Sequence, residues 1–385
     1  MACCDVCPTQ ALSSAIDKNG FRYPIRDFDK CNDCGLCQKI CTVLTQYRFQ
    51  STGKSTIYAA WHHDPVVRKK SSSGGVFAAL AQEIIRQGGH VYGAALDGLN
   101  VHWKKIEHEK DIVFLQGSKY EHSDYSDSYS AVKKDLSAGI PVLFSGLSCQ
   151  VAALQLFLGK DAQNPLLYTV DLVCTGVSSL LPVKFIERAG KGRVSIVSFR
   201  NKDHGWTSSY KLKVEGLDGY SNDVLSSFYY RMYGICKRNN CGRCSFAYHN
   251  RLSDITLADF WGDRNHPEEH ANGVSAVIVH SSRGETLLNN ADCELHQQDF
   301  PDFLQHNHRA TDAEFAANHI SCFWKRMGFL YLRLGYLLHF SIRMTGIVSA
   351  IEWLPLRIMN RLHHRPDTVQ ERERRNDFIF ASKDW

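Results

Sequence analysis

Four cysteines near the start of the chain follow a spacing that is typical of iron–sulfur proteins. Cys31, Cys34, Cys37 and Cys41 form a C-x2-C-x2-C-x3-C run. In such a run three thiolates bind one face of a 4Fe-4S cube, and the fourth turns toward a neighbouring cluster. A zinc site normally pairs two separated C-x2-C segments, and a disulfide framework needs an oxidising compartment. The spacing therefore predicts cluster ligation rather than zinc or disulfides.

A second, partial copy of the run lies upstream. Cys3 and Cys7 match its third and fourth cysteines, and the first two positions would fall before residue 1. We therefore expect the protein to extend further at its N-terminus. Because the fourth cysteine of each run serves the other cluster in two-cluster ferredoxins, Cys7 is predicted to complete the cube held by the first three cysteines of the Cys31 run. Cys3 and Cys41 would then be half of a second site. Cys4 is expected to be a bystander, and the alternative is that it replaces a missing ligand.

Three further cysteines lie within nine residues in the second half of the chain. Cys236, Cys241 and Cys244 predict a metal site, with an iron–sulfur cluster favoured over zinc. A fourth ligand would come from Cys174 or Cys149, each of which follows a predicted strand. The alternative for these last two is that each is a small buried apolar side chain, because free cysteine is often buried.

A serine–glycine segment is the other candidate for ligand binding. Ser72, Ser73, Gly74 and Gly75 directly precede an amphipathic stretch that predicts a helix over 76–87. Hydroxyl groups and free backbone N–H groups at a helix N-terminus can hold a phosphate. The alternative is an ordinary N-cap with a flexible lead-in, and the sequence leaves both open.

Strand-like and helix-like segments alternate from residue 57 onward, which predicts an α/β body with a largely parallel or mixed sheet. Strands are predicted at 90–96, 141–145, 167–174, 194–199 and 210–215, and helices at 76–87, 126–138, 151–158 and 180–189. In such proteins ligands bind beyond the carboxyl ends of strands. Predicted turns at 146–150 and 175–178 lie at such ends, so Cys149 and Cys174 are candidates to face one cleft.

Composition divides the chain into three parts. Residues 1–45 form the ferredoxin-like module, residues 57–320 the larger mixed α/β body, and residues 323–385 a helical basic tail. The tail holds eleven Lys and Arg against six Asp and Glu, so it carries the whole net charge of +5. A neutral body gives no support for nucleic-acid binding. Fourteen cysteines with no secretory leader ahead of them indicate a cytoplasmic redox protein.

The tail between residues 323 and 362 mixes aliphatic and aromatic residues with arginine. Arg333 and Arg343 interrupt its apolar stretch, so a membrane-spanning helix is not expected. The mixture fits peripheral docking on an anionic membrane surface or on a partner protein. Helices packed on the body are the alternative.

Six motifs occur in an order that resembles the coenzyme F420 hydrogenase/dehydrogenase beta-subunit family. The resemblance runs from the cysteine-rich module to about residue 310. The motifs are Ser72-Ser73-Gly74-Gly75-Val-Phe, Gly117-Ser-Lys119-Tyr120, Val142-Leu-Phe-Ser-Gly146-x-x-Cys149-Gln150, Asp171-Leu-Val-Cys174-x-Gly176-Val, Cys241-x-x-Cys244-x-Phe-Ala and Ser253-Asp254-Ile-Thr-x-x-Asp259-Phe-Trp261-Gly262.

The resemblance implies an iron–sulfur flavoprotein. It implies flavin adenine dinucleotide (FAD) in the α/β body, hydride exchange with the deazaflavin coenzyme F420 or a related small molecule, and 4Fe-4S clusters that pass single electrons to a partner protein or subunit. It also implies that Ser72 to Gly75, Lys119, Gly146 and Gln150 line the flavin cleft. Similar proteins occur in bacterial gene sets for surface polysaccharides, which suggests a link to that biosynthesis.

The chain departs from the family pattern at three places. Ser148 stands where the family usually has proline, Thr175 where it has histidine, and Ala258 where it has glycine. If the histidine handles a proton in relatives, that step is lost or moved here. The departures keep a second function open, that of an electron-transfer subunit without catalysis, and no catalytic residue is predicted.

Overall fold

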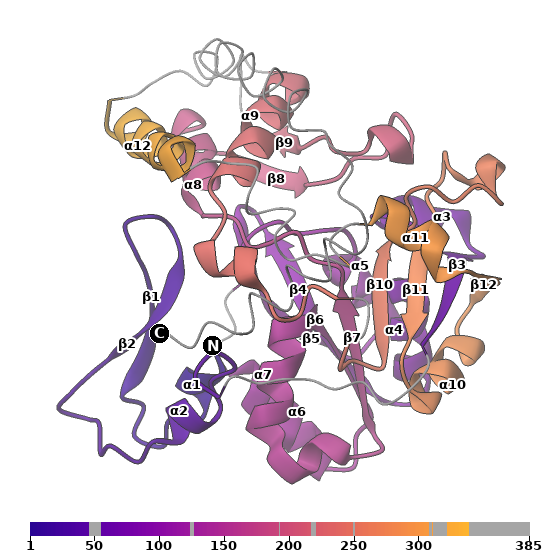
Figure 1. Ribbon diagram of the computed structural model, residues 1–385, viewed down its shortest axis with the longest axis horizontal. Coiled ribbons are helices and arrows are strands. Elements are labelled where there is room, and N and C mark those ends of the chain that lie inside the picture. The colour runs from indigo at the N-terminus through magenta and orange to yellow at the C-terminus, as the bar shows by residue number, and fades with distance from the viewer. Residues whose placement is uncertain are drawn as a thin grey trace, which may run out of the picture. The chain divides into compact units, whose positions relative to one another are not determined.

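The computed structural model describes residues 1–45, 55–123, 127–191, 193–216, 221–248, 251–307, 310 and 322–338. Within them, the largest feature is an eight-stranded mixed sheet in the order β12-β3-β11-β10-β7-β6-β4-β5 (Figure 1). Its strands are β3 (Thr56–His62), β4 (His90–Asp97), β5 (Asn100–Ile106), β6 (Val142–Leu147), β7 (Leu167–Leu172), β10 (Ile255–Asp259), β11 (Ser275–Val279) and β12 (Cys293–Gln298). The predicted mixed α/β body is confirmed.

Five strands of the sheet point in one direction. β10, β7, β6 and β4 pair in parallel, and β3 has the same direction because β11 pairs antiparallel with both β3 and β10. β5, β11 and β12 run the opposite way. The carboxyl ends of the five parallel strands therefore lie along one edge of the sheet, where α/β proteins place ligands.

Both faces of the sheet are covered, as the alternation along β6 shows. Leu143 packs in a cluster with residues of α4 (Val76–Arg86) and α10 (Ser282–Asn290), whereas Val142 and Phe144 pack in a second cluster with residues of α6 (Ser128–Ser137) and α7 (Ser148–Leu158). Successive side chains of a strand point to opposite faces. The two clusters are thus the two faces of one core.

Most predicted elements are confirmed, and two boundaries are wrong. The expected turn at 146–150 does not exist as such, because α7 begins at Ser148 directly after β6; the side-chain oxygen of Gln150 accepts a hydrogen bond from the backbone N–H of Leu147 and starts the helix there. The strand expected at 210–215 is only β9 (Lys213–Glu215), which pairs with β8 (Ser195–Ser198) in a separate small sheet.

The cysteine-rich N-terminal region is small and packs on the body. It consists of α1 (Ala2–Asp5), a hairpin of β1 (Leu12–Ile16) and β2 (Arg22–Arg26), and α2 (Leu36–Lys39). Ala2 and Ile40 are buried in the same cluster as Tyr129 and Phe144. The Asp5 carboxylate accepts hydrogen bonds from backbone N–H groups at the start of α6. These contacts hold the cysteine runs against α6 and α7.

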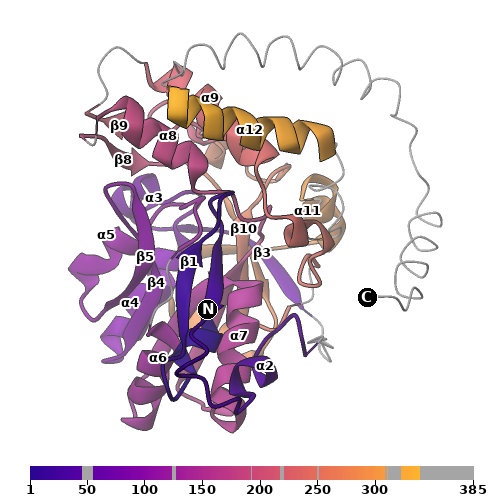
Figure 2. The same cartoon turned by 90° about the vertical axis from the view of Figure 1, so that its left-hand side faces the viewer.

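A group of helices lies beyond the carboxyl edge of the sheet (Figure 2). It contains α8 (Leu181–Ala189), α9 (Asn222–Ile235) and α12 (Cys322–Leu338), and Phe185 of α8 stacks on Tyr331 of α12 at 6.2 Å. The hairpin tip reaches this group, because the Ser179 hydroxyl donates to the Asn19 carbonyl. The remaining helices are α3 (Pro65–Lys70), α5 (Ile112–Leu115) and α11 (Phe300–His306).

The tail prediction is tested only in part. The described stretch, α12, packs on α8 and α9, as the alternative to peripheral docking expects. The rest of the predicted tail, 339–385, lies outside the described residues. None of the described helices combines the length and apolarity that crossing a bilayer requires.

Candidate metal and cofactor site

Four cysteine thiols of the body converge beyond the carboxyl ends of β6 and β7. Cys149 lies in the first turn of α7, and Cys174 lies two residues after β7. Cys241 and Cys244 lie in and after a short 3-10 helix that follows α9. Cys149 is exposed as a residue, but the protein packed around its thiol raises the pKa of that thiol, and the nearby thiols of Cys244, Cys174 and Cys241 raise it further. Residues separated by almost a hundred positions thus form one group, the four-thiol site.

Backbone N–H groups point at two sulfurs of the four-thiol site. The Gly176 N–H donates to Cys174 Sγ at 3.3 Å, and the Val177 N–H donates to Cys241 Sγ at 3.4 Å. Gly176 has a φ of +105°, a conformation that favours glycine. Thiolate ligands and N–H donors to sulfur are what an iron–sulfur cluster uses. The donor set therefore fits a 4Fe-4S cluster, while in the described ranges no three His, Cys, Asp or Glu side chains are placed to close around a single metal ion.

Cys236 is not part of the four-thiol site in the structure, although the sequence groups it with Cys241 and Cys244. It is fully buried, and a Cβ on Gly328 of α12 would lie 3.5 Å from its sulfur. Burial raises the pKa of the Cys236 thiol to about 12, although Lys325 of α12 opposes the rise. Cys236 therefore packs as an apolar side chain beneath α12.

The N-terminal cysteines lie beside the four-thiol site. α1 contacts both α2 and α7, so the two cysteine runs approach each other and the start of α7. Cys7 Sγ accepts the Ala11 N–H at 3.2 Å. Cys4 hydrogen-bonds the Cys3 thiol, which lowers the Cys3 pKa to about 6. Cys4 thus has a defined neighbour in its predicted bystander position.

The exposure of the Cys31 run differs from that of Cys236. Cys34 is exposed, and Cys31, Cys37 and Cys41 are partly exposed. No two of the cysteines that the structure describes are joined in a disulfide. The run is therefore available for the ligation that its spacing predicts.

A buried ion pair braces the four-thiol site. Arg251 lies 3.6 Å from the Asp171 carboxylate, and their side chains are 2% and 0% exposed. The same guanidinium donates to the Ser148 hydroxyl at 2.6 Å and to the Leu172 carbonyl at 2.8 Å. Arg251 thus ties the end of β7 to the residue before Cys149. Sequence reasoning missed Arg251, which lies two residues ahead of a family motif.

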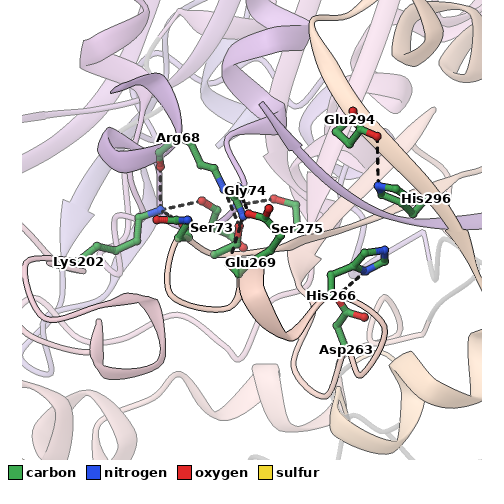
Figure 3. Close-up of polar contacts among 12 residues, drawn as sticks. Arg68, Ser73, Gly74, Lys202, Asp263, His266, Glu269, Ser275, Glu294 and His296 are labelled. Carbon is green, nitrogen blue, oxygen red and sulfur yellow. Dashed lines mark hydrogen bonds and ion pairs between the residues drawn. The ribbon is translucent and has the colours of Figure 1, made fainter. Parts of the chain in front are cut away.

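The predicted serine–glycine segment is packed against β3 and β11 (Figure 3). The Ser73 hydroxyl donates to the Val274 carbonyl at 2.7 Å, and the Gly74 N–H donates to the Ser275 hydroxyl at 2.9 Å. Gly75 takes a φ of +95° and is the N-cap of α4. The segment is therefore a fixed lead-in to the helix rather than the flexible one that the alternative described.

Lys202 holds this segment from outside and was missed by sequence reasoning. Its ammonium donates to the carbonyls of Arg68, Ser73 and Asn272 at 2.7–2.8 Å. Burial lowers the pKa of Lys202 to about 7, and the charges of Arg68 and Arg200 contribute. The three carbonyls oppose this lowering of the pKa, because they accept hydrogen bonds from all three N–H groups of the charged ammonium.

Lys119 lies next to the serine–glycine segment, but its side chain turns back toward the end of the preceding helix, α5. Its ammonium donates to the carbonyls of Leu115 and Gln116 at the end of α5, at 2.8 and 2.7 Å. Burial lowers its pKa to about 7. The neighbouring Ser118 hydroxyl lies 2.7 Å from that of Ser72. The structure thus brings the 115–120 loop and the serine–glycine segment together.

An arginine surrounded by flat rings lies at the end of β10. Arg200 is paired with the Asp259 carboxylate at 2.6 Å and lies over the ring of Tyr210 at 4.7 Å. Trp261 stacks on Trp206, with ring centroids 4.3 Å apart. Asp259 and Trp261 belong to the last family motif. Arg200, Trp206 and Tyr210 lie outside all six motifs, and sequence reasoning missed them.

The remaining predicted cofactor residues lie elsewhere. Gln150 accepts the Leu147 N–H, and a Cβ on Gly146 would come within 2.8 Å of the Gln150 side-chain oxygen. Both residues therefore lie beside Cys149, at the end of β6, rather than with Ser73. A pocket of about 500 Å³ contains none of the predicted residues; it is lined by Gln82, Arg86, Glu109, Asn290, Ala291 and Asp292.

Replacing Gly74 with alanine should destabilise the fold by about 1–3 kcal/mol or more, because overpacking forces backbone shifts. The added Cβ would lie 2.2 Å from the Ala60 carbonyl oxygen and 2.9 Å from the Ser275 nitrogen. The matched control is Gly234→Ala in α9, where a Cβ meets no described atom within 4 Å; it should gain about 0.5–1 kcal/mol. Urea unfolding measures both, and equal stability of the two variants would contradict the packing described for Gly74.

Part of the chain matches a known protein family. Residues 141–299 match the family described as the C terminus of the coenzyme F420 hydrogenase/dehydrogenase beta subunit. Among solved structures, the chain is similar to one chain of the F420-reducing NiFe hydrogenase complex from Methanosarcina barkeri, with 19% identity and a TM-score of 0.48, covering 71% of this chain and 93% of that chain. A comparison with curated proteins gives no match.

The matched segment contains the whole four-thiol site, since Cys149 and Cys244 are the outermost cysteines of that site. It also contains the last four of the six family motifs. Residues 141–299 therefore match the coenzyme F420 hydrogenase/dehydrogenase beta-subunit family, the resemblance that those motifs predicted.

Proposed function

We propose that the chain is an iron–sulfur flavoprotein oxidoreductase that couples hydride exchange at a flavin to one-electron transfer through 4Fe-4S clusters. The proposal rests mainly on the four-thiol site, in which backbone N–H groups donate hydrogen bonds to the sulfurs of Cys174 and Cys241. Its family is associated with oxidoreductases. A flavin can accept two electrons as a hydride and release them one at a time, whereas a 4Fe-4S cube carries only single electrons.

The flavin is proposed to bind near the serine–glycine segment, where two stacked tryptophans lie. A Cβ on Gly273 would lie 3.0 Å from both the Ser73 carbonyl oxygen and the Trp206 ring. The segment therefore adjoins the stacked Trp206 and Trp261. Aromatic side chains and a cation at Arg200 can stack on a flavin ring and favour its anionic groups.

The N-terminal cysteines would form the outer part of the electron path. Cys7, Cys31, Cys34 and Cys37 are the proposed ligands of one cube, and Cys3 and Cys41 the half-site of a second. Because α1 contacts α7, this region lies against the helix that starts with the four-thiol site. Electrons would pass between the body and a partner redox protein through it. The hydride partner would be coenzyme F420 or a related small molecule, and the link to surface polysaccharides stays a prediction.

A second candidate is an electron-transfer subunit without flavin. The specific observation in its favour is that polar groups of the serine–glycine segment are used within the protein, by Val274, Ser275 and Ser118. Lys202 and Lys119 likewise donate to backbone carbonyls. Flavin content separates the two candidates.

The test of the proposed function is Cys34→Ser in protein purified without oxygen. One cluster should disappear, because Cys34 is an exposed thiol of the predicted cube, and the flavin should stay, because its proposed site lies in the body. The matched control is Cys293→Ala, which removes a thiol from the sheet core and should keep all the iron. Iron, sulfide and flavin per chain are measured. A variant that keeps its full iron content would overturn the assignment of the Cys31 run.

A further inference from the structure

A carboxyl group and a phenol are buried together, and two tyrosine rings connect them to the four-thiol site. Glu121 is 8% exposed and Tyr229 of α9 is fully buried. The Tyr229 hydroxyl donates to Glu121 Oε1 at 2.7 Å. The second carboxyl oxygen, Oε2, is also buried and has no hydrogen-bond partner in the part of the chain that the structure describes. A carboxylate with so little solvation favours its protonated form.

The Tyr229 hydroxyl has a choice of two acceptors. Besides Glu121 Oε1 at 2.7 Å, the Tyr120 carbonyl oxygen lies 3.3 Å away. A phenol carries one hydrogen and can donate to only one of them. When Glu121 is ionised, the hydroxyl donates to it. When Glu121 is protonated, the carboxylic acid donates to the phenol, and the phenol is free to donate to Tyr120. The geometry is therefore that of a two-position proton switch.

A layer of tyrosines connects this pair to the four-thiol site. Tyr229 stacks on Tyr233, with ring centroids 6.2 Å apart. The Tyr233 hydroxyl lies 2.7 Å from the Thr175 hydroxyl, in the residue after Cys174. Glu121 itself touches none of the four cysteines in the contacts described. Two buried rings thus separate a charge at the four-thiol site from a charge at Glu121. Because the protein interior screens charges poorly, the two charges can still interact.

We propose that Glu121 is the proton-binding residue of the redox site and takes up one proton when the site is reduced. The inference rests on the proposed function. It also assigns a place to the proton handling that the sequence comparison left open at Thr175. Glu121 affects the site through Tyr229 and Tyr233. It balances the charge of the site and does not touch the reacting atoms.

The step balances in charge and atoms. The reductant would lose one electron to the 4Fe-4S cluster that the four-thiol site would hold, one proton from solvent binds the Glu121 carboxylate, and one O–H bond forms. The Tyr229 hydroxyl keeps its hydrogen, and its hydrogen bond changes acceptor from Glu121 Oε1 to the Tyr120 carbonyl oxygen. Oxidation reverses each change. Adding negative charge in a buried site is unfavourable unless a counter-charge accompanies it, and the proton provides it.

The titratable groups around the pair are few among the described residues. Burial raises the pKa of Glu121 to about 8, and the hydrogen bond from Tyr229 opposes this rise. Tyr229 in turn faces Tyr230 and Tyr233 of its own helix. The ammonium of Lys119, two residues before Glu121, is bound to α5 carbonyls.

The experiment is infrared spectroscopy of the purified holoprotein, in which a protonated carboxylic acid has its own C=O stretch. In a pH titration the wild type should lose one such band as pH rises through about 8, and Glu121→Gln should lack the band. Tyr229→Phe should shift its loss to higher pH, because the ionised form loses its hydrogen bond. Glu83→Gln, at a buried carboxyl paired with Arg86, is the matched control and should keep the band.

Reduction with dithionite at pH 8 then tests the coupling. The band should grow in the wild type and the control while the visible absorbance bleaches, and no growth should occur in Glu121→Gln. Bleaching without growth of the band would overturn this inference and leave the proposed function standing. Absence of any visible chromophore to bleach would overturn the proposed function, and the coupling with it.

Unfolding provides a second readout. The folded state holds the Glu121 proton more tightly than the unfolded state, so this residue's contribution to stability falls as pH rises from about 4.5 to about 8. Glu121→Gln should remove that part of the pH dependence, and an unchanged dependence would contradict a buried proton at Glu121.

Discussion

Cys241→Ser is expected to remove the body cluster, whereas Cys236→Ser should leave it in place. The two cysteines are five positions apart, yet only Cys241 lies in the four-thiol site, where its sulfur accepts the Val177 N–H. The Cys236 thiol packs beneath α12. Loss of one thiolate from a 4Fe-4S cube should reduce the iron content by about four atoms per chain.

The measurement for this pair is iron and acid-labile sulfide per chain, with electron paramagnetic resonance of the reduced protein, all without oxygen. Cys236→Ser is the matched control because it makes the same chemical change in the same segment. If both variants lost the cluster, Cys236 would be a ligand as well, in favour of the grouping that sequence spacing alone suggests. If Cys241→Ser kept the cluster, the four-thiol site would not hold it.

Asp171→Ala is expected to destabilise the apo protein by about 3–5 kcal/mol, because it leaves the buried Arg251 charge without its partner. The Asp171 side chain is 0% exposed, and its other oxygen accepts the Thr256 hydroxyl at 2.5 Å. The change should also reduce the iron content, since Arg251 holds Ser148 next to Cys149.

Denaturant unfolding measures this effect, with Asp223→Ala as the control. Asp223 pairs with Lys211 at the surface, with its side chain 76% exposed, so its removal should change stability by less than about 1 kcal/mol. A loss at Asp171 no larger than that at Asp223 would mean that the Arg251 pair does not support this part of the fold.

The sequence predicted the elements better than their arrangement. Hydrophobic runs such as Val142 to Phe144, whose three side chains are fully buried, mark strands because a buried strand leaves little polar surface. No local pattern could place β11 between β3 and β10, because the order of strands depends on long-range pairing. The direct passage from β6 into α7 was missed because Gly146 looks like a turn residue, whereas Gln150 starts the helix at once.

The candidate site shows the same limit. Spacing grouped Cys236 with Cys241 because they are close in sequence, but the end of α9 turns Cys236 toward α12. Cys149 and Cys174 were proposed as alternative fourth ligands, and the structure brings both to the site. Lys202 and Glu121 carry no motif, since their importance comes from burial and from contacts to distant segments.

The most direct test of the central claim is the cofactor content of the chain purified without oxygen. Iron, acid-labile sulfide, zinc and flavin are quantified together with the absorption spectrum. Iron and sulfide are expected in equal amounts, at the level of at least one 4Fe-4S cluster, together with bound flavin. Zinc without sulfide would contradict this expectation, because the cysteines would then hold a structural ion and no electron path would exist.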